Sequence, residues 1–460
     1  MYNGIFFTNE TDFDKITEHA FEIISSHGAL IEHESFADII CGYAPDKISY
    51  DNKRVKINKN YAREYFMSFR NTAVRERNPT ASASAEIYEG PYLDPYDGEF
   101  KQWDEKRLLS YIKLAKRLPE VGSVSMLGCP IAGLSLLKKP LLEKLYAFKY
   151  GTTGSSAIWD TSLCGKLMDI WEIYANERGV PVSDVFQGGV YMISPLKIGY
   201  TESQQVLWFR DRGLKVFIGT LASLGLSAPV TPAGAIAIHI AEQLFLSFVH
   251  CALYGEKKFA LSCSLSVVDM RTGVFQYGRP EQLLMNTAMS EIADYYGMHF
   301  HSHGGLSDAK VPSFEAGVQK LGTALANVMK GRNGNIVAGL LSVDEVYSPV
   351  QMVLDNEAAG YLKRICRGFE TDDNSLDLEV INDCINESGS FIEQEQTAIN
   401  VRKCIWTPSV FSGEMLNGWN KKTDIDRARD KAISIIEGPD MEPLISNDCE
   451  KKIQNIIDSV

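Results

Sequence analysis

Three histidines at alternate positions mark the segment HFHSHGGLSDAK, residues 299–310. Because successive side chains of a β-strand point to opposite faces, His299, His301 and His303 would share one face of a strand. The two glycines that follow would end this strand, and Asp308 would then lie on the loop that leads into the next helix. In parallel α/β folds such loops carry the functional groups. We therefore predict a functional site here, with His301, His303 and Asp308 as orienting groups.

An alternating pair of histidines can also bind zinc or iron, since both imidazoles reach the same face of the strand. A complete metal site needs further ligands, and the other histidines, at positions 19, 27, 33, 239 and 250, do not fall at predicted strand ends. We predict no tightly bound metal, and a metal-dependent hydrolase that uses His301 and His303 stays as an alternative. In the preferred interpretation the histidines hydrogen-bond an anionic substrate or a cofactor.

Aromatic residues recur where the other predicted strands meet their loops. Several rings that face one cavity suit an alkylated cation, which cannot donate a hydrogen bond and is held by the ring quadrupoles. Packing in the core is the alternative interpretation of each ring. The predicted substrate-binding residues are Tyr92, Trp159, Tyr191, Tyr277 and Tyr347, with Arg271 and Lys310 as partners for a carboxylate.

Eight short β-rich runs alternate with helical patterns between residues 82 and 341. The runs are SASAEIYEG, GSVSMLGCP, TTGSSAIWD, QGGVYMIS, LKVFIGT, KKFALSCSLS, GMHFHSH and NGNIVAGLL. This alternation predicts βαβ units and a parallel sheet. Eight units favour an α/β fold of the (β/α)8 TIM-barrel type over residues 81–375. An open doubly wound sheet is the alternative, because periodicity does not show whether the sheet closes.

Two flanking segments complete the predicted domain organisation. Residues 1–80 form an N-terminal helical segment that packs on the barrel, and residues 376–460 form a C-terminal helical extension. No low-complexity linker precedes the extension, so we expect it to pack on the barrel as well.

Composition places further limits on function. The 460 residues are 45% hydrophobic and 23% charged, with a net charge of −13, which argues against a nucleic-acid partner. Nine cysteines without CxxC pairs fit reduced thiols, and the N-terminus has no signal-peptide pattern, so we expect a cytoplasmic protein. The apolar segment 234–255 contains His239, Glu242, Gln243 and His250, which predicts a buried core helix and no membrane span.

No activated nucleophile is evident in the sequence. There is no GxSxG pattern, and Cys129 and Cys263 lie in apolar runs, where a thiol is typically inert packing. Covalent catalysis by a side chain is therefore not expected.

Four segments, in this order, resemble the trimethylamine methyltransferase family. They are APVTPAGAIAIHIAE (228–242), VVDMRTGVFQYGRPE (267–281), YYGMHFHSHGGLSDAKVPSFEAG (295–317) and GLLSVDEVYSPVQMVLDNEAAG (339–360). The resemblance runs from about residue 10 to residue 415. It implies a TIM barrel that transfers a methyl group from an amine to the cobalt of a corrinoid (cobalamin), which a partner protein carries.

The trimethylamine branch of this family carries pyrrolysine, and this sequence contains none. The resemblance therefore implies the betaine:corrinoid branch, with glycine betaine, proline betaine, carnitine or a related quaternary amine as substrate and a cognate corrinoid protein as partner. Self-association is left open. A betaine-binding protein that has lost methyl transfer is the non-enzymatic alternative.

Overall fold

Helices and strands alternate along most of the chain in this computed structural model, which describes residues 10–73, 79–154, 160–387 and 389–460. Seven strands and eight helices make up the repeating part. The strands are β4 (Ala81–Ala85), β7 (Val121–Val124), β8 (Gly188–Tyr191), β10 (Val216–Gly219), β12 (Leu261–Ser262), β15 (Phe300–His301) and β16 (Gly334–Ala338). The helices are α4 (Glu105–Arg117), α5 (Lys138–Tyr150), α6 (Cys164–Arg178), α8 (Tyr200–Arg210), α9 (Pro232–Tyr254), α10 (Pro280–Tyr296), α11 (Phe314–Met329) and α12 (Pro349–Cys366).

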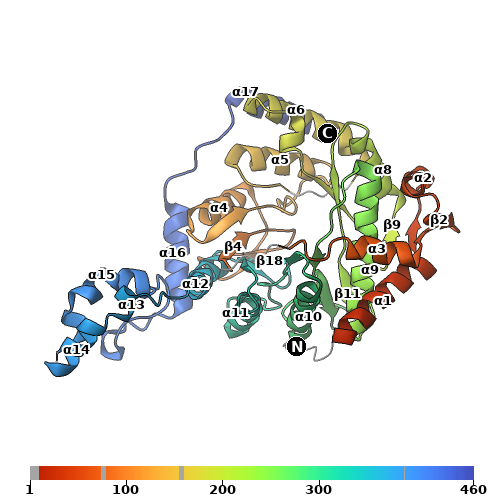
Figure 1. Ribbon diagram of the computed structural model, residues 1–460. Helices are drawn as coiled ribbons and strands as arrows, with labels where there is room; N and C mark the ends of the chain where they lie inside the picture. Colours follow the sequence, from red (N-terminus) through yellow and green to blue (C-terminus); the bar gives the residue numbers. More distant parts are fainter. Residues whose placement is uncertain (1–9, 74–78, 155–159, 388) are drawn as a thin grey trace.

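The helices form a ring around the strands (Figure 1). The first strand of the repeat, β4, pairs in parallel with both β7 and the last strand, β16. In place of the predicted third strand, Thr153 makes a single parallel bridge to Ser125, and the rest of that run lies largely outside the described residues. The predicted α/β fold is therefore confirmed, with a βα order that matches the sequence pattern.

Hydrogen-bonded closure of a TIM barrel is not confirmed. Within the described residues the parallel repeat strands fall into three ladders, β16–β4–β7, β8–β10 and β12–β15. Backbone groups at the ladder edges need other partners when they are buried. The break between β10 and β12 shows what those partners are.

Polar side chains of α9 fill the break between β10 and β12. The Ser262 amide donates to Gln243 Oε1 at 2.9 Å, and Gln243 Nε2 donates back to the Ser262 carbonyl at 2.7 Å. The Ser264 amide donates to His239 Nε2 at 3.2 Å. At the other edge, the Val216 amide donates to Tyr254 Oη at 3.0 Å. The helix thus supplies the bonds that a neighbouring strand would have made.

Glu242 of α9 holds the chain on the other side of the same break. Its carboxylate accepts hydrogen bonds from the Ser194 hydroxyl at 2.9 Å, from the Leu196 amide at 2.9 Å and from the Thr220 hydroxyl. Beyond the break the sheet resumes, because β11 (Ala222–Leu224) pairs in parallel with β13 (Leu265–Val268), which pairs with β14 (Phe275–Gln276). Although α9 is long and apolar enough to cross a membrane, 78% of its most apolar window is buried in the protein. It is a core helix, as predicted.

The N-terminal segment contains strands that the sequence analysis did not predict. Helices α1 (Glu10–Ser26), α2 (Glu34–Tyr43) and α3 (Lys59–Met67) are joined by β1 (Ala29–Ile31), β2 (Ile48–Asp51) and β3 (Arg54–Ile57). These strands form a sheet in the order β2–β3–β1–β9, with β9 (Lys197–Ile198). The segment packs through α1 and α2 against α9.

Short elements cap the repeat strands. The strands β5 (Tyr92–Leu93), β6 (Phe100–Lys101), β17 (Leu340–Leu341) and β18 (Val346–Tyr347) form a sheet in the order β17–β18–β5–β6. The helices η1 (Thr161–Leu163) and α7 (Val182–Val185) lie before and after α6.

The C-terminal extension divides into a packed part and a protruding part. Helix α16 (Asp424–Glu437) packs on α12 and α4, and α17 (Asn447–Asp458) packs on α5 and α6. Between α12 and α16, helices α13 (Asp373–Leu376), α14 (Leu378–Asn386), η2 (Phe391–Glu393) and α15 (Glu395–Cys404) extend away from the ring, and η3 (Leu416–Gly418) follows (Figure 1). Within the predicted extension of residues 376–460, residues 376–405 extend away from the ring, whereas α16 and α17 pack on it (Figure 1).

A buried ion pair joins the last two units of the repeat. Lys320 Nζ of α11 lies 2.7 Å from Asp355 Oδ2 of α12, and both side chains are at most 3% exposed. The same carboxylate accepts from the Gly339 amide at 2.8 Å and from Gln351 Nε2 at 2.8 Å.

We predict that Asp355→Ala destabilises the protein by about 3–5 kcal/mol, because it leaves the Lys320 ammonium buried without its counter-charge. Thermal unfolding followed by circular dichroism checks this. The matched control is Asp430→Ala, which removes a half-exposed pair with Lys422 and should cost less than about 1 kcal/mol. Equal shifts for the two variants would contradict the prediction.

Candidate functional site

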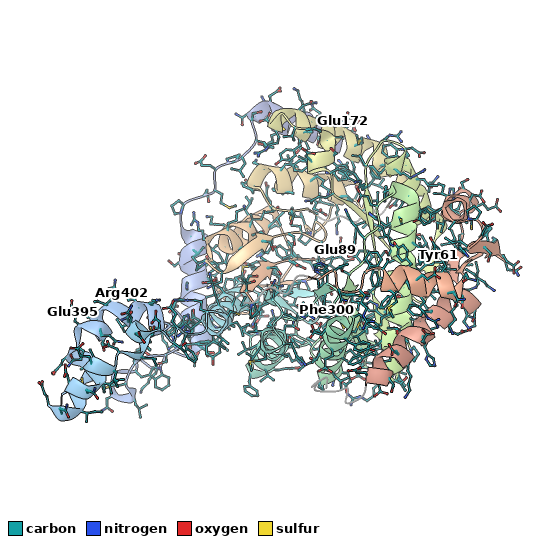
Figure 2. All side chains as sticks on the ribbon, in the orientation of Figure 1. Tyr61, Glu89, Glu172, Phe300, Glu395 and Arg402 are labelled. Carbon is teal, nitrogen blue, oxygen red and sulfur yellow. The ribbon has the colours of Figure 1, made fainter. Side chains whose placement is uncertain are left out.

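The interior of the ring is open to solvent. Helices cover the outer face of these strands, so a strand side chain that points outward should be buried. A strand side chain that is exposed should therefore point inward to an open space. Phe217 is 60% exposed and Tyr191 52% exposed, and His301 is also exposed. Tyr191 and His301 are the last residues of β8 and β15, at the carboxyl ends where α/β folds place ligands, whereas Phe217 is the second of the four residues of β10. Figure 2 places Glu89, which follows β4 by a few residues, near the centre of the ring.

Two carboxyl groups that the sequence analysis missed lie at this end of the strands. Glu86 directly follows β4, and Asp344 lies between β17 and β18. Burial raises the pKa of both carboxyl groups. Glu86 accepts a hydrogen bond from the Ser84 hydroxyl at 3.3 Å, and that hydroxyl accepts one from Asn335 Nδ2 at 2.9 Å. In the sequence, the only signal for Glu86 and Asp344 was that each follows a strand.

The charges of these carboxyl groups act on two of the predicted tyrosines. Burial, and after it the charge of Glu86, raises the pKa of Tyr191. Burial is the main cause that raises the pKa of Tyr277, and Coulombic interactions with Asp344 and then Tyr191 raise it further. The Tyr277 ring also lies 5.4 Å, centroid to centroid, from the ring of His303. The rings of Tyr277 and His303 are thus neighbours, and Glu86 and Asp344 act on Tyr191 and Tyr277 electrostatically.

Asp308 holds the backbone of the segment that carries Tyr277. Its carboxylate accepts hydrogen bonds from the Tyr277 amide at 2.7 Å and from the Gly278 amide at 3.0 Å. Arg279 bridges this buried carboxylate and Asp269, at 4.0 Å and 3.1 Å. Asp308 therefore holds the backbone of Tyr277 and Gly278 in place.

The two predicted histidines differ in their surroundings. His301 lines a pocket of about 480 Å³ that also contains Tyr191, Gly219, Thr220 and Gln243 and lies at the break between β10 and β12. His303 is held by its amide, which donates to Asn286 Oδ1 at 3.0 Å, while Gln282 Nε2 lies 3.2 Å from its Nδ1. Burial lowers the pKa of His303 to about 4, so this imidazole is neutral at pH 7 and can offer a hydrogen bond without a charge.

Several predicted site residues lie elsewhere. Tyr92 and Tyr347 are 3% and 2% exposed, and both rings pack against Trp103. The Tyr347 ring also packs against Tyr92 and Tyr111, and the centroids of these ring pairs are 5.1 to 5.6 Å apart. The rings of Tyr92 and Tyr347 both belong to the core. The Arg271 side chain is 85% exposed and pairs with Asp269 at 3.1 Å, which gives it a surface role.

The remaining predictions have mixed outcomes. Lys310 Nζ donates to the Ser342 hydroxyl at 2.8 Å, close in sequence to Asp344. Trp159 lies outside the described residues. Burial raises the thiol pKa of Cys129 to about 11 and of Cys263 to about 12, so neither is an activated nucleophile. Among the described residues, no three histidine, cysteine, aspartate or glutamate side chains are grouped to hold a metal ion.

Comparison with known proteins places the chain in a family. Residues 155–459 match the profile of the trimethylamine methyltransferase (MTTB) family. Trimethylamine methyltransferase MttB of Methanosarcina barkeri (strain Fusaro / DSM 804) is 28% identical over 272 residues, which are 58% of this chain and 54% of that protein. The glycine betaine methyltransferase of Desulfitobacterium hafniense (strain Y51) is 26% identical over 231 residues, 50% of this chain and 48% of that protein.

The chain spans about half the length of the curated relatives it matches. The crystal structure of the Methanosarcina barkeri monomethylamine methyltransferase (MtmB) aligns over 93% of both chains at 13% identity, with a TM-score of 0.45. The profile match covers more than half of the sequence and includes all four resembling segments. We conclude that the chain belongs to the trimethylamine methyltransferase family.

Proposed function

We propose that this protein transfers a methyl group from a quaternary amine, such as glycine betaine, to the cobalt of a corrinoid that a partner protein carries. Family membership supports methyl transfer from an amine, and the absence of pyrrolysine from the sequence favours a betaine over trimethylamine. The ring of β/α units would act as a TIM barrel whose ladder is interrupted, and the protein would work in the cytoplasm.

The observation that carries the proposal is the combination of Glu86 and Asp344 with the rings of Tyr191 and Tyr277. A quaternary ammonium group cannot donate a hydrogen bond, so ring faces and negative charges are the groups that can bind it. Each ring contact contributes about 0.5–2 kcal/mol. The carboxylates add a Coulombic attraction that is stronger in a partly desolvated site than in water. An anionic substrate without such a cation would be repelled.

The protein's task in this reaction is to bind and orient the amine. The corrinoid supplies the nucleophile when the partner protein presents it. The leaving group is a neutral tertiary amine, so no side chain has to protonate it. Positive charge on nitrogen falls as the methyl group departs, and the carboxylates and rings therefore bind the ground state more tightly than the transition state. They improve affinity, while Asp308 and the packing around Tyr277 fix the direction of the methyl group.

The open interior fits a partner that carries the methyl acceptor. Tyr191 and His301 are exposed at the carboxyl ends of the strands, so a bound amine would remain accessible from that end. A closed cavity would have excluded a macrocycle attached to another protein.

The direct test mixes the purified protein with photoreduced cobalamin and a panel of betaines under anoxic conditions. We expect loss of the cobalt(I) absorption and formation of methylcobalamin with at least one betaine. Binding of a betaine without methyl transfer, either to cobalamin or to a corrinoid protein, would instead support a non-catalytic binding protein.

We predict that substrate affinity depends on the ionisation of Glu86. Because the pKa of its carboxyl is raised by burial, the negative charge that attracts the cation is lost as the pH falls through that raised pKa. The Kd for glycine betaine should therefore decrease as the pH rises from 5 to 8. Calorimetric titration checks this, and Glu86→Gln should weaken binding roughly 10-fold, as expected for about 1.4 kcal/mol, and make the pH profile shallower, since only Asp344, whose pKa burial also raises, still titrates. An unchanged profile in the variant would remove Glu86 from the site.

We further predict that His301 contacts the carboxylate end of the substrate. His301→Ala should raise the KM for glycine betaine several-fold and leave the affinity for tetramethylammonium, which has no carboxylate, nearly unchanged. His299→Ala is the matched control, because His299 is an exposed histidine two residues earlier that does not line the pocket. Equal loss of both ligands in His301→Ala would show a general packing role.

A further inference from the structure

The pocket at the break between β10 and β12 is long and narrow, and it follows one face of α9. Four of its lining residues on this helix, Gln243, Leu246, His250 and Tyr254, recur at spacings of three and four residues. From position 243 to position 254 the helix rises about 16 Å, at about 1.5 Å per residue. The pocket volume of about 480 Å³ is typical of sites for small molecules. The pocket therefore reaches well beyond its lining residue His301.

The two ends of this pocket lie at opposite ends of the strands. Tyr191 pairs in register with Gly219, the last residue of β10, and both line the pocket. At the other end, Tyr254 Oη accepts a hydrogen bond at 3.0 Å from the amide of Val216, the first residue of β10. The three steps along β10 from Val216 to Gly219 span about 10 Å, at roughly 3.3 Å per residue. The pocket thus connects the carboxyl ends of the strands, where the candidate site lies, with their amino ends.

The lining of the pocket is apolar in its middle and basic at the amino end. Phe217, Leu246 and Phe259 contribute rings and a branched side chain, and Lys258 contributes an ammonium group. Among the described residues that line the pocket there is no aspartate or glutamate. A negatively charged ligand group is therefore favoured over a positive one at the amino end.

The surroundings of the amino end keep the same sign of charge. Glu256 lies next to the pocket and pairs with Lys258 at 2.7 Å and with Lys215. Two lysines thus share one carboxylate, which leaves an excess of positive charge beside the pocket.

Two polar groups at the amino end have unused hydrogen-bonding capacity. Nε2 of His250 is buried and has no hydrogen-bond partner in the described part of the chain, with Glu256 Oε2 3.5 Å away. The Tyr254 hydroxyl accepts a bond from the backbone, and its own proton has no acceptor among the residues that the structure describes. The centroids of the two rings are 5.0 Å apart, so one carboxylate can accept from both. A buried donor without an acceptor costs about 1–3 kcal/mol, which such a ligand would recover.

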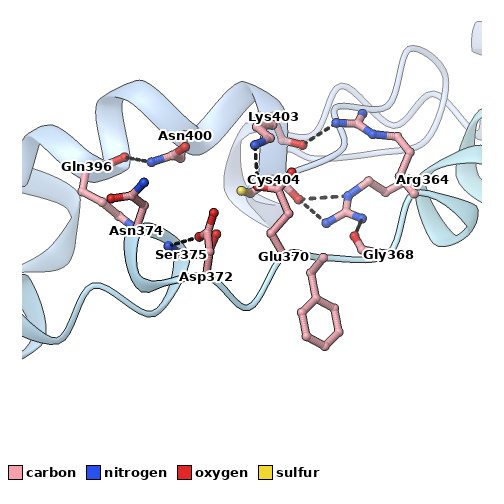
Figure 3. A pocket seen from close by; sticks show the side chains of 12 residues that line it. Arg364, Gly368, Glu370, Asp372, Asn374, Ser375, Gln396, Asn400, Lys403 and Cys404 are labelled. Atoms are coloured by element: carbon pink, nitrogen blue, oxygen red, sulfur yellow. Dashed lines mark hydrogen bonds and ion pairs between the residues drawn. The ribbon is translucent and has the colours of Figure 1, made fainter.

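The cations of the larger pocket in Figure 3 are, by contrast, already bound within the protein. Arg364 donates to the carbonyls of Cys404 and Gly368 at 2.8–3.0 Å, and Lys403 pairs with Glu370 at 2.9 Å (Figure 3). The pocket at the break combines leftover donors with a direct connection to the candidate site, and it is the better place for a further part of the substrate.

We propose, on the basis of the proposed function, that the pocket at the break binds the tail of the substrate, and that this substrate is a quaternary amine whose carboxylate lies several methylene groups from the nitrogen. The ammonium group would lie at Tyr191, and the methylene chain would pack along Phe217. The carboxylate would accept hydrogen bonds from His250 and Tyr254 at the amino end.

The length of the pocket sets the length of this tail. An extended chain advances about 3.3–3.6 Å for every three bonds, so a span of about 10 Å takes roughly eight or nine bonds. Because the side chains at both ends project into the pocket, about five to seven methylene groups should suffice. Glycine betaine, with one methylene group, would fill only the outer end beside His301.

Calorimetric titration with a series of trimethylammonio carboxylates tests the tail site without any corrinoid. The series has one, three, five or seven methylene groups between nitrogen and carboxylate, and its first member is glycine betaine. We expect the Kd to fall at least 10-fold from glycine betaine to the best of the longer acids. Hexyltrimethylammonium, which matches the acid with five methylene groups but lacks the carboxylate, should bind at least 10-fold more weakly than that acid.

Two variants test the residues at the amino end. His250→Leu should abolish the preference for the long acid over hexyltrimethylammonium and, in the cobalamin assay, raise the KM for the long acid with little change in kcat. Lys258→Gln, which alters a side chain that is 71% exposed, should reduce the same preference without affecting folding. The matched control is His27→Leu, a change of an exposed histidine in the turn after α1, which should keep the preference. Circular dichroism should show that all three variants are folded.

The outcomes separate the tail site from the proposed function. Methyl transfer from glycine betaine without tighter binding of any longer acid would refute the tail site and leave the proposed function standing. A chain-length preference that both His250→Leu and Lys258→Gln leave intact would also refute it. Tight, carboxylate-dependent binding of a long acid without methyl transfer to cobalamin or a corrinoid protein would support the ligand assigned to the pocket and reject the proposed reaction.

Discussion

Helix α9 takes the place of a missing strand pairing, and the arrangement of the site follows from this substitution. A parallel sheet normally satisfies its backbone groups by strand-to-strand bonds that do not depend on side-chain identity. Between β10 and β12 those bonds come from Gln243, His239 and Tyr254. The strands are held apart there, and the resulting space forms the pocket that His301 and Tyr191 share. Glu242 fixes the turn after β8 from the same helix.

The sequence predicted the order of strands and helices because each element has its own local signal. Hydrophobic runs of strand length and amphipathic helices that stop at glycine gave seven of the eight strands and the helices between them. The short strands of the N-terminal segment were missed, since β1, β2 and β3 have only three or four residues each and lie between helices. The ladder break was not predictable either, because it depends on which backbone groups the side chains of α9 reach in three dimensions.

The candidate site was predictable only in part, for a related reason. The alternating histidine pattern correctly predicted that His301 lies at the end of a strand. The ring of His303 lies next to the ring of Tyr277. A tyrosine at a strand end can face the interior or the core, and sequence does not distinguish the two, so Tyr92 and Tyr347 were included with Tyr191. Glu86 and Asp344 were overlooked because single acidic residues after strands are common. Their significance comes from burial, which is a property of the folded chain.

The α9 side chains that fill the break between β10 and β12 affect how the pocket can differ between related proteins. Where two strands pair directly, their backbone hydrogen bonds fix the wall of a pocket whatever the side chains are. Such a wall changes only when a strand shifts. A wall made of Gln243 and Tyr254 depends on residue identity, so one or two substitutions can enlarge, narrow or repolarise the pocket while the ladders on either side stay in register. The break thus gives this fold a place where ligand size and polarity can diverge without rebuilding the sheet.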